Sequence, residues 1–293
     1  MNVFVLLGLG AAAGLLAGMF GVGGGFLATP LLIFVGIPPA VAVASQANQV
    51  IANSVSSFQV QWRRGNVDLR MGLVLLVGGM IGSTAGVALF TYLKNIGQID
   101  FVIAVLYVVM LSTIGLLMLI ESLRTYIKRR RNPGAPRGKL HTHYLVHRLP
   151  LKLRFYKSKL YISALLPVGV GFVIGVLSAI LGVGGGFVLV PAMIYLLGMP
   201  TTVVIGTSNF QILFVAANVT FLQAATNGTV DVVLALLLIL GGVVGAPIGS
   251  RLAAKLPGVV LRGLMSVLIL AVAGQLLVEL LRTPSLPFSL GPR

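Results

Sequence analysis

The chain contains no cysteine and only five acidic residues among its 293 positions. The lack of cysteine excludes disulfide bonds, thiol redox chemistry and cysteine-ligated metal sites. The histidines, His141, His143 and His147, are crowded by lysine and arginine, which would repel a metal ion. We interpret them as solvated loop residues. With so few groups that could transfer protons or attack a substrate, the sequence predicts neither an enzyme nor a cofactor.

Charge is scarce overall, at 9% of the residues, whereas 57% are hydrophobic and the mean hydropathy is +1.05. Several apolar runs reach the roughly 20 residues that cross a bilayer as a helix. Lipid admits only helices and closed barrels, and these runs are continuous rather than alternating. The sequence therefore predicts an all-α polytopic membrane protein. Because no basic group precedes the first apolar run, we expect no cleaved signal peptide.

The net charge of +16 is concentrated, with 12 of the 21 lysines and arginines in the segment 124–159. The positive-inside rule accounts for such a segment better than nucleic-acid binding does, and places it in the cytoplasm. Its first part, Lys128–Pro136, is rich in proline, glycine and like charge, which predicts a loop. Its second part, Leu149–Phe155, alternates apolar and basic residues, which predicts a short hairpin on the membrane face.

The motif GVGGGF occurs twice, at Gly21–Phe26 and Gly182–Phe187, and each copy is followed by a proline, Pro30 or Pro191. The two halves also match in their polar, glycine and closing residues. The matched pairs are Gly36 and Gly198, Gln49 and Gln211, Asp68 and Asp231, Gly78 and Gly241, and Glu121 and Glu279. The sequence thus predicts two homologous repeats, 1–123 and 160–283, with a basic joint at 124–159 and a tail at 284–293.

Each repeat is predicted to hold a glycine-broken helical region followed by three spans. The broken regions are 3–36 and 160–197, and the spans are 40–61, 69–92, 99–123, 202–225, 231–252 and 260–281. If the broken region crosses the membrane once, the repeats are parallel; if it turns back at its glycines, they are inverted. Inversion puts 18 of the 21 basic residues on one side, against 17 for the parallel arrangement. We favour inversion, with the joint cytoplasmic in either case.

The paired breaks are the first candidate site. Glycine lets the backbone bend and expose its N–H groups, and the half-helix that follows presents a partly positive N-terminus, which suits an anion. Paired interruptions in two halves point to the binding site of a secondary transporter. Close helix packing is the alternative role for these glycines. The candidates are Gly21, Gly23, Gly24, Gly25, Gly182, Gly184, Gly185 and Gly186.

The span after each break is unusually polar and supplies the second group of candidates. Gln49, Asn53 and Ser56 are spaced to share one helix face, which must look inward because amides are costly in lipid. Hydroxyl and amide donors suit an oxyanion, although hydrogen bonds between helices would explain the same residues. The predicted donors are Ser45, Gln49, Asn53, Thr207, Asn209 and Gln211.

Two further carboxylates stand near span ends, Glu121 and Glu279, each with an arginine three residues on. This spacing predicts interfacial ion pairs. A proton-relay role is the alternative, because carboxylates at membrane depth are functional candidates by default.

The two GVGGGF…P segments, the polar stretches that follow them and the loop at Arg63–Asp68 resemble the sulfite exporter TauE/SafE family, also called the 4-toluene sulfonate uptake permeases. The resemblance covers both halves. It implies a transporter in a bacterial or archaeal cytoplasmic membrane for sulfite, a sulfonate or a related small organic anion.

The hypothesis from the sequence is a secondary transporter that works by alternating access, with H⁺ or Na⁺ as a possible coupling ion. An anion channel and a non-transporting membrane scaffold are the alternatives. The basic joint is longer than a minimal loop between halves, and we expect it to contact membrane lipid or a partner.

Overall fold

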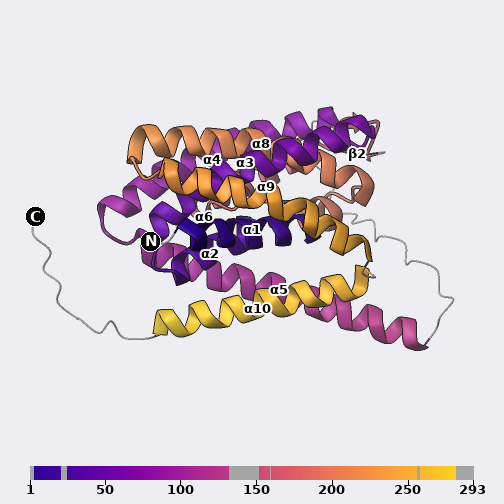
Figure 1. Cartoon of the computed structure of the whole chain (residues 1–293). Helices are drawn as coiled ribbons and strands as arrows, with labels where there is room; N and C mark the ends of the chain where they lie inside the picture. The colour runs from indigo at the N-terminus through magenta and orange to yellow at the C-terminus, as the bar shows by residue number, and fades with distance from the viewer. Residues whose placement is uncertain (1–2, 21–24, 132–151, 159, 256–257, 282–293) are drawn as a thin grey trace, which may run out of the picture.

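The computed structural model describes residues 3–20, 25–131, 152–158, 160–255 and 258–281, which form a helical bundle with one two-stranded hairpin (Figure 1). The first half contains α1 (Val3–Phe20), α2 (Gly25–Phe34), α3 (Pro39–Arg63), α4 (Leu69–Asn95) and α5 (Ile99–Arg131). The hairpin consists of β1 (Lys152–Phe155) and β2 (Leu160–Ser163). The second half contains α6 (Leu165–Leu181), α7 (Gly186–Pro191), α8 (Thr201–Leu222), α9 (Val232–Lys255) and α10 (Gly258–Leu281). Short π-helical segments, Ala192–Leu196 and Gln223–Asn227, extend α7 and α8.

Five helices are long and apolar enough to cross a membrane, which confirms the prediction of an all-α polytopic membrane protein. They correspond to α4, α5, α8 with its π-helical extension, α9 and α10. The helices α1, α2, α6 and α7 are apolar but shorter. The helix α3 has the length of a span, at 25 residues, but carries the serine, glutamine and asparagine side chains noted above.

Both glycine-broken regions fold back on themselves. Leu6, near the start of α1, packs in one cluster with Leu32, near the end of α2. In the second half, Leu166 at the start of α6 packs with Met193 and Leu197, which follow α7. The beginning of each region therefore packs in the same cluster as its end.

The halves interlock through close contacts between small residues. A β-carbon at Gly14 of α1 would lie 2.5 Å from the Gly242 carbonyl oxygen of α9, and one at Gly78 of α4 would lie 2.0 Å from the Val168 carbonyl oxygen of α6. Contacts this close need glycine, as at many helix crossings in membranes. The first helix of each half therefore packs against a later helix of the other half.

The last helices of the two halves, α5 and α10, run antiparallel along one edge of the bundle (Figure 1). Gly263 near the start of α10 approaches Ser122 near the end of α5, and Gly115 approaches Leu270 at mid-height. The helices α3 and α8 also run antiparallel, because Gly206 at the start of α8 lies against Gln61 near the end of α3. Each of these pairs thus joins one helix from each half.

The structure corrects several predicted boundaries around the joint. The helix α5 continues to Arg131, so residues 128–131, predicted as the start of the loop, are helical. Arginine, lysine and leucine are good helix formers, and the first residue that stops the run is Pro133. Residues 160–163, predicted to begin the second broken region, form β2 instead, because tertiary contacts override the helical preference of such a short apolar run. The rest of the predicted loop and the three histidines lie outside the described residues.

The predicted hairpin exists and is anchored to the start of α4. Strand β1 pairs antiparallel with β2, with Arg154 opposite Tyr161. The Asp68 side chain accepts hydrogen bonds from the Ser158 backbone N–H (3.0 Å) and hydroxyl (2.6 Å), while its other oxygen accepts from the Met71 N–H (3.2 Å). Asp68 therefore caps α4 and holds the hairpin against it. Sequence reasoning assigned no role to Asp68, although an aspartate directly before a span is a typical N-cap.

Candidate functional site

The second glycine break is a left-handed turn between α6 and α7. Gly182, Gly184 and Gly185 have φ angles of 67°, 68° and 72°, a conformation that side chains with a β-carbon disfavour. Space also requires glycine, because a β-carbon at Gly182 would lie 2.3 Å from the Val43 carbonyl oxygen of α3. This turn frees the first N–H groups of α7, beginning at Gly186, in the buried centre of the protein.

The two broken regions meet at this turn. Gly25 begins α2, and a β-carbon there would lie 3.1 Å from the Val183 carbonyl oxygen of the second break. The next residue, Phe26, stacks on Phe187 with ring centroids 5.0 Å apart, and both rings are buried. Val50 of α3 touches the β-carbon positions of both Gly25 and Gly184. Two helix starts therefore converge beside α3. Gly21, Gly23 and Gly24 of the first break lie outside the described residues.

Ser45 and Thr207 make equivalent hydrogen bonds between the halves. The Asp231 backbone N–H donates to the Ser45 hydroxyl oxygen, and the Asp68 backbone N–H donates to the Thr207 hydroxyl oxygen, each at 3.0 Å. Each polar helix thus contacts the residue that caps a long span of the opposite half. These two predicted donors hold helices together in this structure, which is the alternative role considered above.

Gln49 and Gln211, which are equivalent in sequence, differ in their hydrogen bonds. The Gln49 amide nitrogen donates to the Gly10 carbonyl oxygen (3.3 Å), and its oxygen accepts from the Gln46 amide (2.8 Å). Gln211 is fully buried, and neither its amide nitrogen nor its oxygen has a partner among the described residues. A buried amide without partners costs about 1–3 kcal/mol, so Gln211 is, among the predicted donors that the structure describes, the one most available for a ligand.

The remaining predicted donors are placed as follows. The Asn209 amide donates to the Ile205 carbonyl oxygen in its own helix (2.7 Å). Asn53 is half-buried on α3 and has an interaction partner. Beyond it Ser56 is exposed and bonds the Ala52 carbonyl oxygen, so the face shared by Gln49, Asn53 and Ser56 runs from the core to the surface.

Sequence reasoning missed a buried tyrosine beside the break. Tyr107 of α5 is fully buried, and its hydroxyl donates to the Leu181 carbonyl oxygen, immediately before Gly182. This bond satisfies a carbonyl at the end of α6 and fixes α5 to the turn. A single tyrosine inside an apolar span was the available signal, because a buried tyrosine hydroxyl usually finds a partner.

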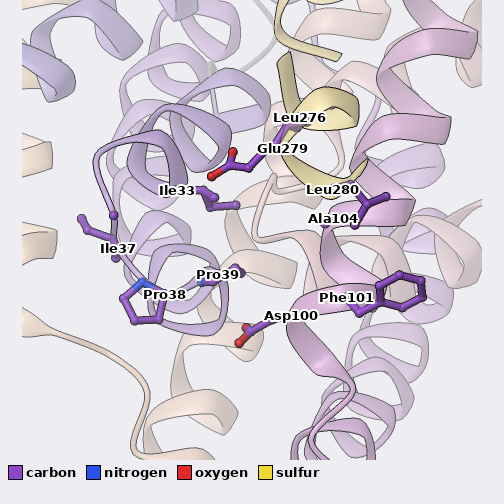
Figure 2. Close-up of a pocket in the computed structure, with 11 residues that line it drawn as sticks. Ile33, Ile37, Pro38, Pro39, Asp100, Phe101, Ala104, Leu276, Glu279 and Leu280 are labelled. Atoms are coloured by element: carbon purple, nitrogen blue, oxygen red, sulfur yellow. The ribbon is translucent and has the colours of Figure 1, made fainter. Parts of the chain in front are cut away.

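A cavity of about 400 Å³ lies where α5 begins and α10 ends, against the loop that follows α2. Figure 2 shows Asp100 and Glu279 on its α5 and α10 sides and Pro38 and Pro39 opposite them. The cavity thus brings together two of the chain's five acidic residues. The predicted ion pairs of Glu121 and Glu279 involve the side chains of Glu121 and Arg282, which lie outside the description.

The fold and these features define a polytopic membrane protein of the transporter class, with paired broken helices meeting in its core. The family model described as "Sulfite exporter TauE/SafE" matches residues 6–276. The chain therefore belongs to the TauE/SafE family and is a membrane transporter of that type, as the sequence predicted.

Three relatives carry names of the same kind. A "Probable membrane transporter protein" of Xylella fastidiosa (strain 9a5c) is 29% identical over 87% of this chain and 86% of its own length. The "Probable membrane transporter proteins" YjnA and YunE of Bacillus subtilis (strain 168) are 29% and 26% identical, over 92% and 95% of this chain and 97% and 98% of their own lengths. No solved structure matches the chain significantly.

Proposed function

We propose that this protein is a secondary transporter of a small sulfur-containing anion, sulfite or a sulfonate, that works by alternating access between two inverted repeats. The observation that carries the proposal is the convergence of α2 and α7, whose starts at Gly25 and Gly186 lie together in the core beside α3. Helix starts offer free N–H groups and partial positive charge, so they bind an anion without a buried lysine or arginine.

Inversion of the repeats accords with the packing of the helices. Equivalent helices run antiparallel in the α5–α10 and α3–α8 pairs, and the beginning of each broken region packs in one cluster with its end. Alternating access would then exchange the arrangements of the two halves around the central breaks.

Gln211 is the side chain that we assign to the substrate. Its amide nitrogen is a buried donor without a partner among the described residues, and an oxyanion oxygen would satisfy it. Ser45 and Thr207 act indirectly, because their bonds to Asp231 and Asp68 position the polar helices α3 and α8.

The test is uptake of radiolabelled sulfite by proteoliposomes that contain Gly185→Ala or its control, Gly198→Ala. Both glycines have positive φ, 72° and 73°, so alanine strains the backbone similarly at each. Only at Gly185 does the new β-carbon meet a neighbour, Ile174 at 2.3 Å, whereas nothing lies within 4 Å of Gly198. We expect folded Gly185→Ala to lose sulfite binding and most uptake, and Gly198→Ala to keep both. Native uptake by folded Gly185→Ala would show that the glycine break is not part of the substrate-binding site.

Counterflow separates a carrier from the two other hypotheses. Unlabelled sulfite inside the vesicles should accelerate entry of labelled sulfite, because a carrier exchanges substrate across the membrane. Ohmic currents without counterflow would indicate a channel, and the absence of flux for every sulfur anion tried would indicate a scaffold.

Coupling to H⁺ or Na⁺ belongs to the same proposal, and the cavity with Asp100 and Glu279 is where we expect it to act, because it gathers two of the chain's five acidic residues. Uptake driven by a pH gradient or by a Na⁺ gradient identifies the ion. Asp100→Asn with Glu279→Gln should reduce gradient-driven uptake and leave counterflow intact. Equal loss of both would assign the two carboxylates to folding or substrate binding instead.

A further inference from the structure

A second cavity, of about 370 Å³, lies between the hairpin and the start of α4. It is lined by Arg70, Leu73 and Val74 from α4 and by Leu153, Arg154 and Phe155 from β1. Figure 1 places the hairpin at the opposite end of the bundle from the end of α10, where the acidic cavity lies. The two ends of the protein therefore carry cavities of opposite charge.

The two arginines of this cavity share one aromatic ring. The guanidinium carbons of Arg70 and Arg154 lie 5.2 Å and 5.4 Å from the centroid of the Tyr156 ring. Among the described residues, neither guanidinium pairs with a carboxylate. The ring offsets their mutual repulsion only in part, so the pair remains a site of positive charge that an anion would stabilise.

The hairpin holds Arg154 beside Arg70 as a fixed part of the fold. Asp68 accepts two hydrogen bonds from Ser158, and the Lys157 ammonium donates to the Gly65 carbonyl oxygen (3.2 Å). Phe155 is buried in one cluster with Met71 of α4. Buried contacts thus fix the backbone that carries Arg154 next to α4, so the two exposed arginines stand close together before binding.

The rest of the cavity wall is apolar and lies at the start of the membrane-length helix α4. Two of its residues, Leu73 and Leu153, are 52% and 45% exposed. A free phosphate would contact only the arginines and leave the leucines in water. A phospholipid would place its phosphate on the arginines and its acyl chains on the leucines.

We propose that the cavity binds an anionic phospholipid, with the headgroup phosphate bound by Arg70 and Arg154 and the acyl chains packed on Leu73 and Leu153. This inference is independent of the transported substrate. The second repeat offers no equivalent, because Val233 stands where Arg70 would be, and the described part of that half contains no hairpin. The lipid therefore binds at one membrane face only.

The test uses the purified full-length protein in detergent micelles with added phosphatidylglycerol or phosphatidylcholine, and measures bound lipid by native mass spectrometry and the melting temperature. We expect phosphatidylglycerol to bind and to raise the melting temperature, and phosphatidylcholine to do neither. Arg70→Gln with Arg154→Gln should lower the affinity for phosphatidylglycerol about 30-fold, as expected for two basic contacts to an anionic headgroup.

The matched control is Arg63→Gln with Arg64→Gln, which removes the same charge from exposed positions that do not line the cavity. It should keep the native affinity. Arg154→Gln alone, which leaves α4 unchanged, serves if the double variant does not fold, and should lose part of the affinity. Native affinity in folded Arg70→Gln/Arg154→Gln or Arg154→Gln would overturn the proposal, as would equal loss in the control. Stabilisation by inorganic phosphate equal to that by phosphatidylglycerol would also overturn it, in favour of a free anion.

Discussion

Asp68 and Asp231 occupy equivalent positions in the two halves and share two interactions. Each backbone N–H bonds a hydroxyl on the polar helix of the other half, Thr207 for Asp68 and Ser45 for Asp231. Each side chain also caps the long helix that follows, by accepting from the Met71 or Leu234 N–H. The duplicated sequence therefore repeats the contacts that interlock the halves.

The difference is the hairpin. Asp68 is 3% exposed and bonds Ser158, whereas Asp231 is exposed and makes no bond of this kind within the described residues. Arg154 on the hairpin thus adds to Arg70 at one end of the bundle, whereas Asp100 and Glu279 lie at the other end. The repeats supply the common framework, and the added segment distinguishes one membrane face from the other.

Substituting Asp68 and Asp231 should reveal the largest difference between the halves in the free energy of unfolding that is lost. Asp68→Ala loses a cap and two charge-assisted bonds to the hairpin, and we expect a cost of about 3 kcal/mol. Asp231→Ala loses only a cap on an exposed helix start, which costs about 1 kcal/mol. Equilibrium unfolding in mixed micelles measures both values.

Ser158→Ala provides the control, because it removes the hydroxyl bond to Asp68 and leaves the cap intact. Its cost should fall between the costs of the two aspartate variants. Equal destabilisation by Asp68→Ala and Asp231→Ala would show that the hairpin adds nothing to stability.

Substitution of Gln49 should lower the stability of the protein, whereas substitution of Gln211 should weaken its binding of sulfite. Gln49→Leu leaves the Gly10 carbonyl and the Gln46 amide without their bonds, so we expect a loss of about 2 kcal/mol. Gln211→Leu removes a polar group that has no partner among the described residues, and should be nearly neutral in stability. Its effect should appear as weaker sulfite binding and slower uptake.

Sulfite titration by thermal shift, compared with unfolding in mixed micelles, separates these outcomes. Unchanged sulfite affinity in stable Gln211→Leu would remove Gln211 from the substrate site. A stability loss as large as that of Gln49→Leu would mean that Gln211 has a partner in the resting protein.

The smallest difference should come from the two hydroxyls. Ser45→Ala and Thr207→Val each remove one acceptor of a backbone N–H bond between the halves, and each should cost about 1 kcal/mol. The same unfolding measurement should give two equal values. A clear inequality would mean that the two interlocking bonds are not equivalent.

The sequence correctly predicted those structural features that depend on neighbouring residues in the chain. The glycine motif predicted a break at Gly182–Gly186, since left-handed residues at positions 182, 184 and 185 favour glycine and interrupt a helix. The apolar runs predicted the long helices within a few residues. The prediction was wrong at residues 160–163, because a short apolar run fits either a helix or a strand. It was also wrong at the end of α5, where we interpreted the charged residues as a loop although arginine and lysine favour a helix.

The sequence by itself determined the membrane class, the family and the position of the second break, because hydropathy, motifs and backbone conformation are encoded locally. Only the tertiary structure decided which polar groups are partnered. Ser45 bonds a residue 186 positions away, Asp68 bonds one 90 positions away, and Gln49 is satisfied where Gln211 is not. Hydrogen bonds in a lipid-embedded core depend on how helices from both halves meet, and that arrangement is set by packing over the whole chain.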